Sequence, residues 1–74
     1  MITCIIEDLE PSQRFCTRCE KPLKRTFAWC ERNCLTGEYF TSHGNVAENE
    51  SQGWFPFGLD CAKRIEKDPY AARR

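Results

Sequence analysis

Two cysteines three positions apart, Cys16 and Cys19, carry the clearest chemistry in this sequence. A CxxC pair on a tight turn presents both sulfurs to one ion while backbone amides point at the thiolates, which is the spacing of a zinc knuckle. A redox CxxC is the alternative, but no βαβ pattern surrounds this pair. Two buried free cysteines are the plainest reading, and four further cysteines in so short a chain argue against it. The pair therefore predicts a metal site.

A structural zinc ion takes four ligands, so two more are needed. Cys30 and Cys34 form a CxxxC that could complete a four-cysteine ribbon, or one of them could join Cys61. Cys61 falls in the first turn of an expected helix, where the amide dipoles favour a thiolate. His43 could also reach the knuckle, although a lone histidine is more often an ordinary surface or core residue. The candidate ligands of one structural Zn²⁺ are Cys16, Cys19, Cys30, Cys34 and Cys61.

The length of the chain explains why a metal would matter. A sequence of 74 residues makes one domain, and a domain of this size buries only about 60% of the surface that its unfolded chain exposes. Such domains often need a disulfide, a metal or a partner. We find no secretory leader and no stretch near the ~18 apolar residues of a membrane span. We therefore expect a cytoplasmic protein, in which reduced cysteines indicate metal binding before disulfides.

The charges are balanced overall but not along the chain. There are 11 basic and 11 acidic residues, whereas a protein that holds nucleic acid mainly through phosphates is usually net basic. This balance favours a protein partner. The basic residues gather within residues 14–32, at Arg14, Arg18, Lys21, Lys24, Arg25 and Arg32. This patch is a candidate contact for phosphates or for an acidic protein surface, and a solvated face is the plain alternative.

Short strands and turns are expected to position the cysteines. Residues 2–6 are β-branched and apolar and predict a strand, in which Cys4 packs and does not bind metal. Residues 26–31 and 38–43 predict the two strands of a hairpin. Residues 44–53 are polar with a glycine at each end and predict a loop.

The C-terminal part predicts an extended aromatic segment over 54–58 and then a short helix, LDCAKRIEK. Leu59, Ala62 and Ile65 share one face of that helix, Asp60 is the expected N-cap, and Pro69 lies beyond its end. The fold class is therefore a small zinc-stabilised α+β domain, ribbon-like or treble-clef-like, with a knuckle, a β-hairpin and a C-terminal helix. We expect one domain over residues 1–68 and a flexible basic tail over 69–74.

Three aromatic residues, Trp54, Phe55 and Phe57, lie within four positions. Strand alternation and Pro56 prevent all three from sharing one regular face. They can cover the metal site and close a small core, or one or two can remain exposed as anchors for a partner, since aromatic residues are enriched at interface hot spots. The candidate partner-binding residues are Arg18, Lys21, Lys24, Arg25, Trp54, Phe55 and Phe57.

No catalytic pattern is recognisable. A catalytic zinc keeps an open position and usually has a nearby general base, and the sequence contains no HExxH, no phosphate-binding loop and no nucleophile elbow. A ligand pocket of ~300 Å³ or more is also hard to build in so small a fold. We therefore expect a binding protein and not an enzyme.

The strings CTRCEKPLKR and GWFPFGLDCAKRI resemble a group of short zinc-binding proteins common in bacteriophage genomes. The resemblance covers roughly residues 15–66. The matching positions are Cys16, Cys19, Pro22, Leu23, Gly58, Cys61 and Lys63. Glu20 stands where a glycine is usual in that group, and Cys30 and Cys34 are additional.

The resemblance implies a treble-clef-like or ribbon-like fold and a phage protein acting in the host cytoplasm. It also implies binding to host machinery, with RNA polymerase as the leading partner and transcription initiation or termination as the process altered. The alternative is a nucleic-acid-binding zinc module that acts through its basic knuckle. A structural accessory module of a larger complex is a third possibility. In each case we expect a monomer without membrane contact.

Overall fold

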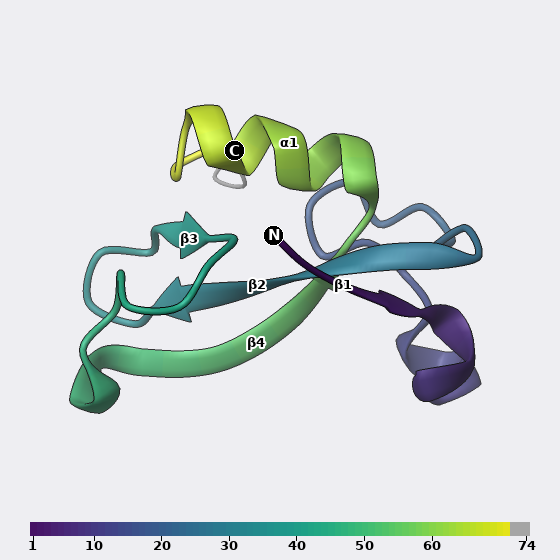
Figure 1. The fold of residues 1–74 in the computed structure, drawn as a ribbon, viewed down its shortest axis with the longest axis horizontal. Helices are drawn as coiled ribbons and strands as arrows, with labels where there is room; N and C mark the ends of the chain where they lie inside the picture. Colours follow the sequence, from purple (N-terminus) through teal and green to yellow (C-terminus); the bar gives the residue numbers. More distant parts are fainter. Residues whose placement is uncertain (72–74) are drawn as a thin grey trace.

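Strand β2 (Thr26–Asn33) is the central strand of an antiparallel sheet. Strand β4 (Ser51–Phe57) pairs along one edge of β2. Along the other edge, β1 (Ile2–Ile5) pairs with the first half of β2 and β3 (Tyr39–Phe40) with the second half. Helix α1 (Leu59–Lys67) packs on one face of the sheet in the computed structural model, which describes residues 1–71 (Figure 1). The expected α+β fold with a C-terminal helix is thus confirmed.

Short 3-10 helices occupy the connections. They are η1 (Ile6–Asp8), η2 (Pro11–Gln13) and η3 (Glu48–Glu50). The first two follow β1 and lie on the side of the sheet away from α1, near the start of β2 (Figure 1). Leu9, between them, is buried in the same apolar cluster as Phe27, which is completely buried. The face away from α1 is therefore covered near the start of β2.

The expected loop over residues 44–53 is wrong in its second half. It contains η3, and β4 begins at Ser51. The reason is the length of β2, which continues to Asn33 and pairs there with Ser51. The Ser51 hydroxyl also donates a hydrogen bond to Glu31 Oε2 at 2.8 Å. Cross-strand pairing thus outweighs the polar, loop-like composition of this segment.

The second strand of the expected hairpin is much shorter than predicted. Only Tyr39 and Phe40 pair with β2. The turn before them is tight, because the Asn33 side-chain oxygen accepts hydrogen bonds from the backbone N–H groups of Leu35 and Thr36 at 2.8 and 3.2 Å. Asparagine favours such turns since its side chain replaces a backbone acceptor.

Helix α1 occupies the predicted residues 59–67. Ala62 and Ile65 are 0% and 1% exposed, as expected from their spacing. The prediction that Asp60 caps the helix is wrong: Gly58 is the N-cap, no side chain caps it, and Asp60 lies exposed in the first turn. The extended backbone of Gly58 continues directly from β4, so the helix begins two residues earlier than it would with Asp60 as its N-cap.

The segment after the helix contacts the sheet and the knuckle. Tyr39 N–H donates to the Pro69 carbonyl at 2.9 Å, and Arg18 Nε donates to the Ala71 carbonyl at 3.0 Å. The beginning of the predicted basic tail is therefore attached to the body of the domain. Its remaining part, 72–74, lies outside the described residues. No helix within residues 1–71 is long and apolar enough to cross a membrane.

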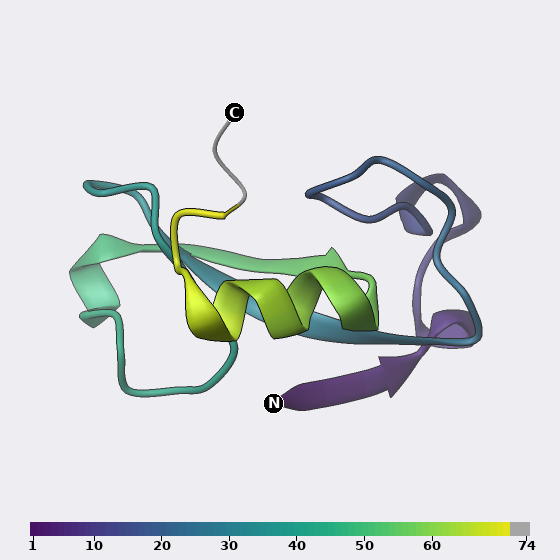
Figure 2. The ribbon, with the colours of Figure 1, turned by 90° about the horizontal axis from the view of Figure 1, so that it is seen from above.

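The two faces of the sheet differ in their cover. Toward α1, Tyr39 packs edge-on against Phe57 with ring centroids 5.0 Å apart, and both Phe57 and Cys30 are completely buried. Trp29 and Trp54 lie on the opposite face. Successive residues of a strand face opposite sides, and Trp29 is next to Cys30 in β2 while Trp54 is three positions before Phe57 in β4. Figure 2, looking down on α1, shows the helix above β2 and β4 and the 14–25 segment beyond its N-terminal end.

Candidate metal centre

The knuckle is a tight reversal of the chain between Cys16 and Lys21. Glu20 N–H donates to the Cys16 carbonyl at 2.8 Å, and Cys16 N–H donates to the Lys21 carbonyl at 2.9 Å. The turn requires a left-handed backbone at Glu20, whose φ is 62°. Glycine adopts this conformation without steric cost. Glu20, which has a side chain, is thus the strained position of the turn.

Thr17 ties the knuckle to the sheet. Its backbone N–H and its hydroxyl both donate to the Pro56 carbonyl at 2.9 Å. Since that carbonyl points away from β2, the imino nitrogen of Pro56 points away as well, and no ladder hydrogen bond is lost. A proline inside β4 is therefore compatible with the sheet, and its carbonyl is available to hold the knuckle.

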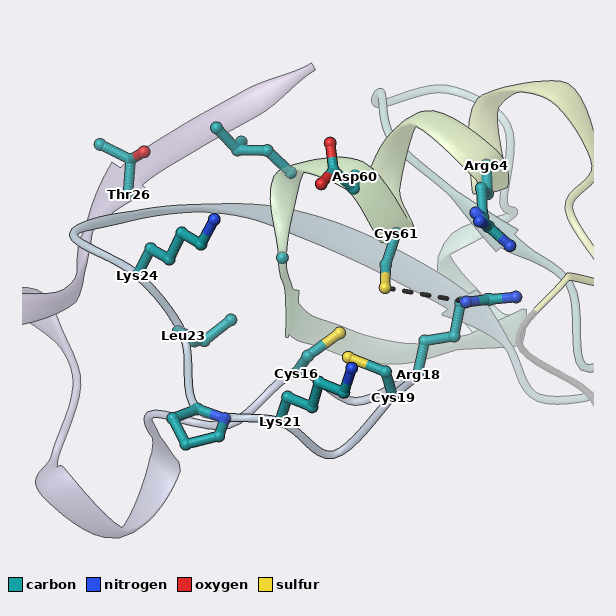
Figure 3. A pocket seen from close by; sticks show the side chains of 13 residues that line it. Cys16, Arg18, Cys19, Lys21, Leu23, Lys24, Thr26, Asp60, Cys61 and Arg64 are labelled. Carbon is teal, nitrogen blue, oxygen red and sulfur yellow. Dashed lines mark hydrogen bonds between the residues drawn. The ribbon is translucent and has the colours of Figure 1, made fainter.

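Three cysteine sulfurs converge where the knuckle meets the helix. The sulfurs of Cys16, Cys19 and Cys61 all lie within 4.8 Å of one another. Figure 3 shows them facing a common space, two from the knuckle and one from the first turn of α1. Thiolates around one tetrahedral zinc ion lie about 3.8 Å apart, given Zn–S bonds near 2.3 Å. Small side-chain shifts would therefore bring these three sulfurs to a single ion.

The surroundings of the sulfurs act on their ionisation in opposite directions. A backbone hydrogen bond from Lys21 lowers the pKa of Cys19, and burial opposes it. Burial raises the pKa of Cys61 to about 11, against a hydrogen bond from Arg18 Nη1 to its Sγ at 3.8 Å. Three adjacent thiolates need a compensating positive charge, which a divalent ion supplies directly. The cluster can therefore hold a metal ion.

The structure does not bring the other predicted ligands to this cluster. Cys30 is completely buried between β2 and α1, and desolvation raises the pKa of its thiol to about 12. Cys34 is exposed in the turn after β2, at the far end of that strand from the knuckle. A four-cysteine ribbon with this CxxxC would need β2 to fold back on itself. The ring of His43 instead packs against Trp54, with centroids 4.7 Å apart.

A cavity of about 550 Å³ opens beside the triad, between the knuckle and the first half of α1. All three cysteines line it. Its charged lining residues are Arg18, Lys21, Lys24, Asp60 and Arg64 (Figure 3). Sequence reasoning missed Arg64 and the role of Asp60, although Arg64 lies three residues after Cys61 and thus on the same side of a helix.

The other predicted basic residues lie elsewhere. Arg25 is exposed and does not line the cavity. Arg14 Nε donates to the Leu9 carbonyl at 3.1 Å, and the Arg32 guanidinium lies 5.9 Å from the centre of the Tyr39 ring. The basic stretch of the sequence is therefore divided in space, and only Arg18, Lys21 and Lys24 stay together.

The aromatic segment is divided between the two faces of the sheet. Phe57 is completely buried and is therefore not an exposed anchor, whereas Phe55 is partly buried against the core. Trp54 is partly exposed on the opposite face. There a shallow, open depression of the surface is lined by Ile2, Trp29, His43 and Trp54. Ile2 and Trp29 were not predicted to take part, because only the pairing of β1 with β2 places them together.

Comparison with protein-family models, with curated proteins and with solved structures finds no match to this chain.

Proposed function

We propose that this chain is a zinc-stabilised recognition module and not an enzyme. The observation that carries the proposal is the convergence of Cys16, Cys19 and Cys61 at the contact between knuckle and helix. Soft thiolate ligands favour zinc over calcium, magnesium or manganese. A knuckle followed by antiparallel strands and a helix that carries a ligand is typical of treble-clef-like domains, and we assign the chain to that class.

The surface that we assign to a partner protein is the aromatic groove, defined as Ile2, Trp29, His43 and Trp54. Two partly exposed tryptophans, Trp29 and Trp54, share this sheet face, and tryptophan is among the residues enriched at interface hot spots. Trp29 and Trp54 lie on the face away from α1, and the groove shares no residue with the cavity beside the cysteine triad. We propose an apolar side chain of a protein partner as its occupant.

Bacterial RNA polymerase is the partner that we propose from the resemblance to phage zinc-binding proteins. The test is retention of polymerase subunits from a bacterial lysate on tagged, zinc-loaded protein. Trp54→Ala should reduce retention by at least about tenfold, as expected for a hot spot worth ~2 kcal/mol. Leu35→Ala is the matched control, because Leu35 is 73% exposed and lies outside the groove. Equal retention by both variants, or none by the parent, rejects the assignment.

Metal analysis tests the zinc assignment separately. Native mass spectrometry of the purified chain should show one zinc ion, lost on substitution of any one of the three clustered cysteines. If the purified chain contains no metal and still unfolds cooperatively, the proposal that zinc stabilises this domain is wrong.

Nucleic-acid binding is the second candidate function. It is favoured by the basic side chains around the cavity, with Lys21 at the end of the knuckle and Lys24 just after it. Binding to RNA or DNA should then fall steeply with salt. Reversing the charges of Lys21, Lys24 and Arg25 should abolish it, and unchanged binding would count against this candidate.

A further inference from the structure

The cavity beside the cysteine triad has an excess of positive charge. Among the described residues 1–71, four basic side chains line it and one carboxylate, that of Asp60. A divalent ion with three thiolates carries one net negative charge, so the cavity stays positive even when the metal is bound. A wall of cations in a partly enclosed site concentrates anions, because the low-dielectric surroundings focus the field.

The basic side chains are available to an anion to different degrees. Arg18 is engaged with Cys61 Sγ and with the Ala71 carbonyl. Within residues 1–71, by contrast, no carboxylate forms an ion pair with Lys21, Lys24 or Arg64, although all three border the cavity. These three side chains come from both walls, Lys21 and Lys24 from the 14–25 segment and Arg64 from α1 (Figure 3).

The start of α1 borders the same cavity. Gly58, Leu59 and Asp60 line it, and no side chain caps the helix. The first intrahelical bond from this end runs from Ala62 N–H to the Gly58 carbonyl at 2.9 Å, so the amides before Ala62 have no intrahelical acceptor. A helix N-terminus carries a positive partial charge and favours phosphate groups.

We propose that this cavity binds a phosphate group carried by a small molecule. The phosphate is held by Lys21, Lys24 and Arg64 next to the metal centre. The cavity, at about 550 Å³, is larger than one inorganic phosphate and is also lined by Pro22, Leu23 and Leu59, which offer an apolar wall to the rest of a phosphate ester. A walled cavity on a chain of zero net charge fits a small ligand better than an extended nucleic-acid strand.

The experiment is a titration of the full-length, zinc-loaded protein, followed by amide NMR shifts and calorimetry. The probes are inorganic phosphate, adenosine monophosphate, and adenosine as the uncharged control. We expect saturable binding of the two phosphates with shifts at the knuckle and the first turn of α1, and none with adenosine. Arg64→Gln should weaken binding about tenfold, the effect of one charge-assisted hydrogen bond. Lys63→Gln, next to it but outside the cavity, should leave binding unchanged.

Three results would overturn the inference. They are no saturation with either phosphate, equal binding of adenosine and adenosine monophosphate, and equal effects of the Arg64 and Lys63 variants. If a single-stranded oligonucleotide without terminal phosphate binds more tightly than either phosphate, the ligand of this cavity is a nucleic-acid strand and not a small phosphate ester. Because the same samples are assayed for zinc, failure of the metal centre is recognised independently. The inference does not depend on the aromatic groove.

Discussion

Thr17 donates two hydrogen bonds to one acceptor, the carbonyl of Pro56, with its backbone N–H and its hydroxyl both at 2.9 Å. Two of the three clustered cysteines flank Thr17 in the knuckle, while Pro56 lies in the strand that leads into α1 and Cys61. This pair of bonds therefore fixes the distance between the two halves of the metal centre.

Substitution of Thr17 should loosen that attachment. Thr17→Val keeps the shape and the backbone bond but removes the hydroxyl donor, and we expect a loss of about 1 kcal/mol in the free energy of unfolding. Urea denaturation of the zinc-loaded protein measures it. Thr3→Val, at an exposed position of β1, is the control and should change stability by less than half as much. Equal effects would mean that the hydroxyl of Thr17 contributes nothing specific.

Removal of the metal should unfold the domain. Structural zinc contributes on the order of 10 kcal/mol to folding in small zinc domains, more than a core of this size provides. A chelator, or Cys61→Ser, should therefore abolish the cooperative thermal transition followed by circular dichroism. Cys34→Ser should retain both the metal and the transition, since Cys34 is exposed outside the cluster. A cooperative melting transition of Cys61→Ser would mean that Cys61, and therefore helix α1, supplies no essential metal ligand.

Replacement of Cys30 tests whether this buried thiol joins the ion. Its sulfur does not belong to the group of three sulfurs that lie within 4.8 Å of one another. We expect the visible absorption of the Co²⁺-loaded protein to be the same for Cys30→Ala as for the parent, because the thiolate count at the metal is unchanged. Cys19→Ser should shift and weaken the same bands. A shift with Cys30→Ala would assign Cys30 as the fourth ligand.

Glu20 is the position at which a glycine should stabilise the protein. Its φ of 62° is costly for a residue with a side chain, by roughly 1–2 kcal/mol. Part of that gain is offset by the larger chain entropy of glycine in the unfolded state, so we expect Glu20→Gly to stabilise by up to about 1 kcal/mol. Glu10→Gly, at a φ of −61°, should destabilise instead. Destabilisation by both changes would mean that the turn at Glu20 is not strained.

The stability of the domain should fall in alkaline solution through Tyr39. Burial raises the pKa of this phenol above its usual value of 10, with the Arg32 charge opposing. The unfolded chain therefore ionises first, so the contribution of Tyr39 is complete below pH 10 and declines as the pH rises through and beyond that value. The free energy of unfolding of Tyr39→Phe should fall less steeply over this range in urea titrations. Parallel curves for both proteins would exclude Tyr39 as the cause.

Local spacing determined the parts of this protein that form within a few residues of one another. The Cys16–Cys19 turn, the strand at residues 26–31 and the helix at 59–67 all depend on nearby backbone geometry and on short-range apolar periodicity. The placement of Cys61 in the first helical turn belongs to the same class. These features were predictable because the physical forces that produce them act within one or two turns of chain.

Tertiary structure alone decided which cysteines meet. Strand β2 carries Cys30 into the core and Cys34 to its far end, while β4 returns antiparallel and delivers Cys61 to the knuckle. The docking of α1 against the sheet likewise places Arg64 beside the cavity. Strand register and helix docking are set by burial of side chains far apart in sequence, and no short-range pattern contains that information.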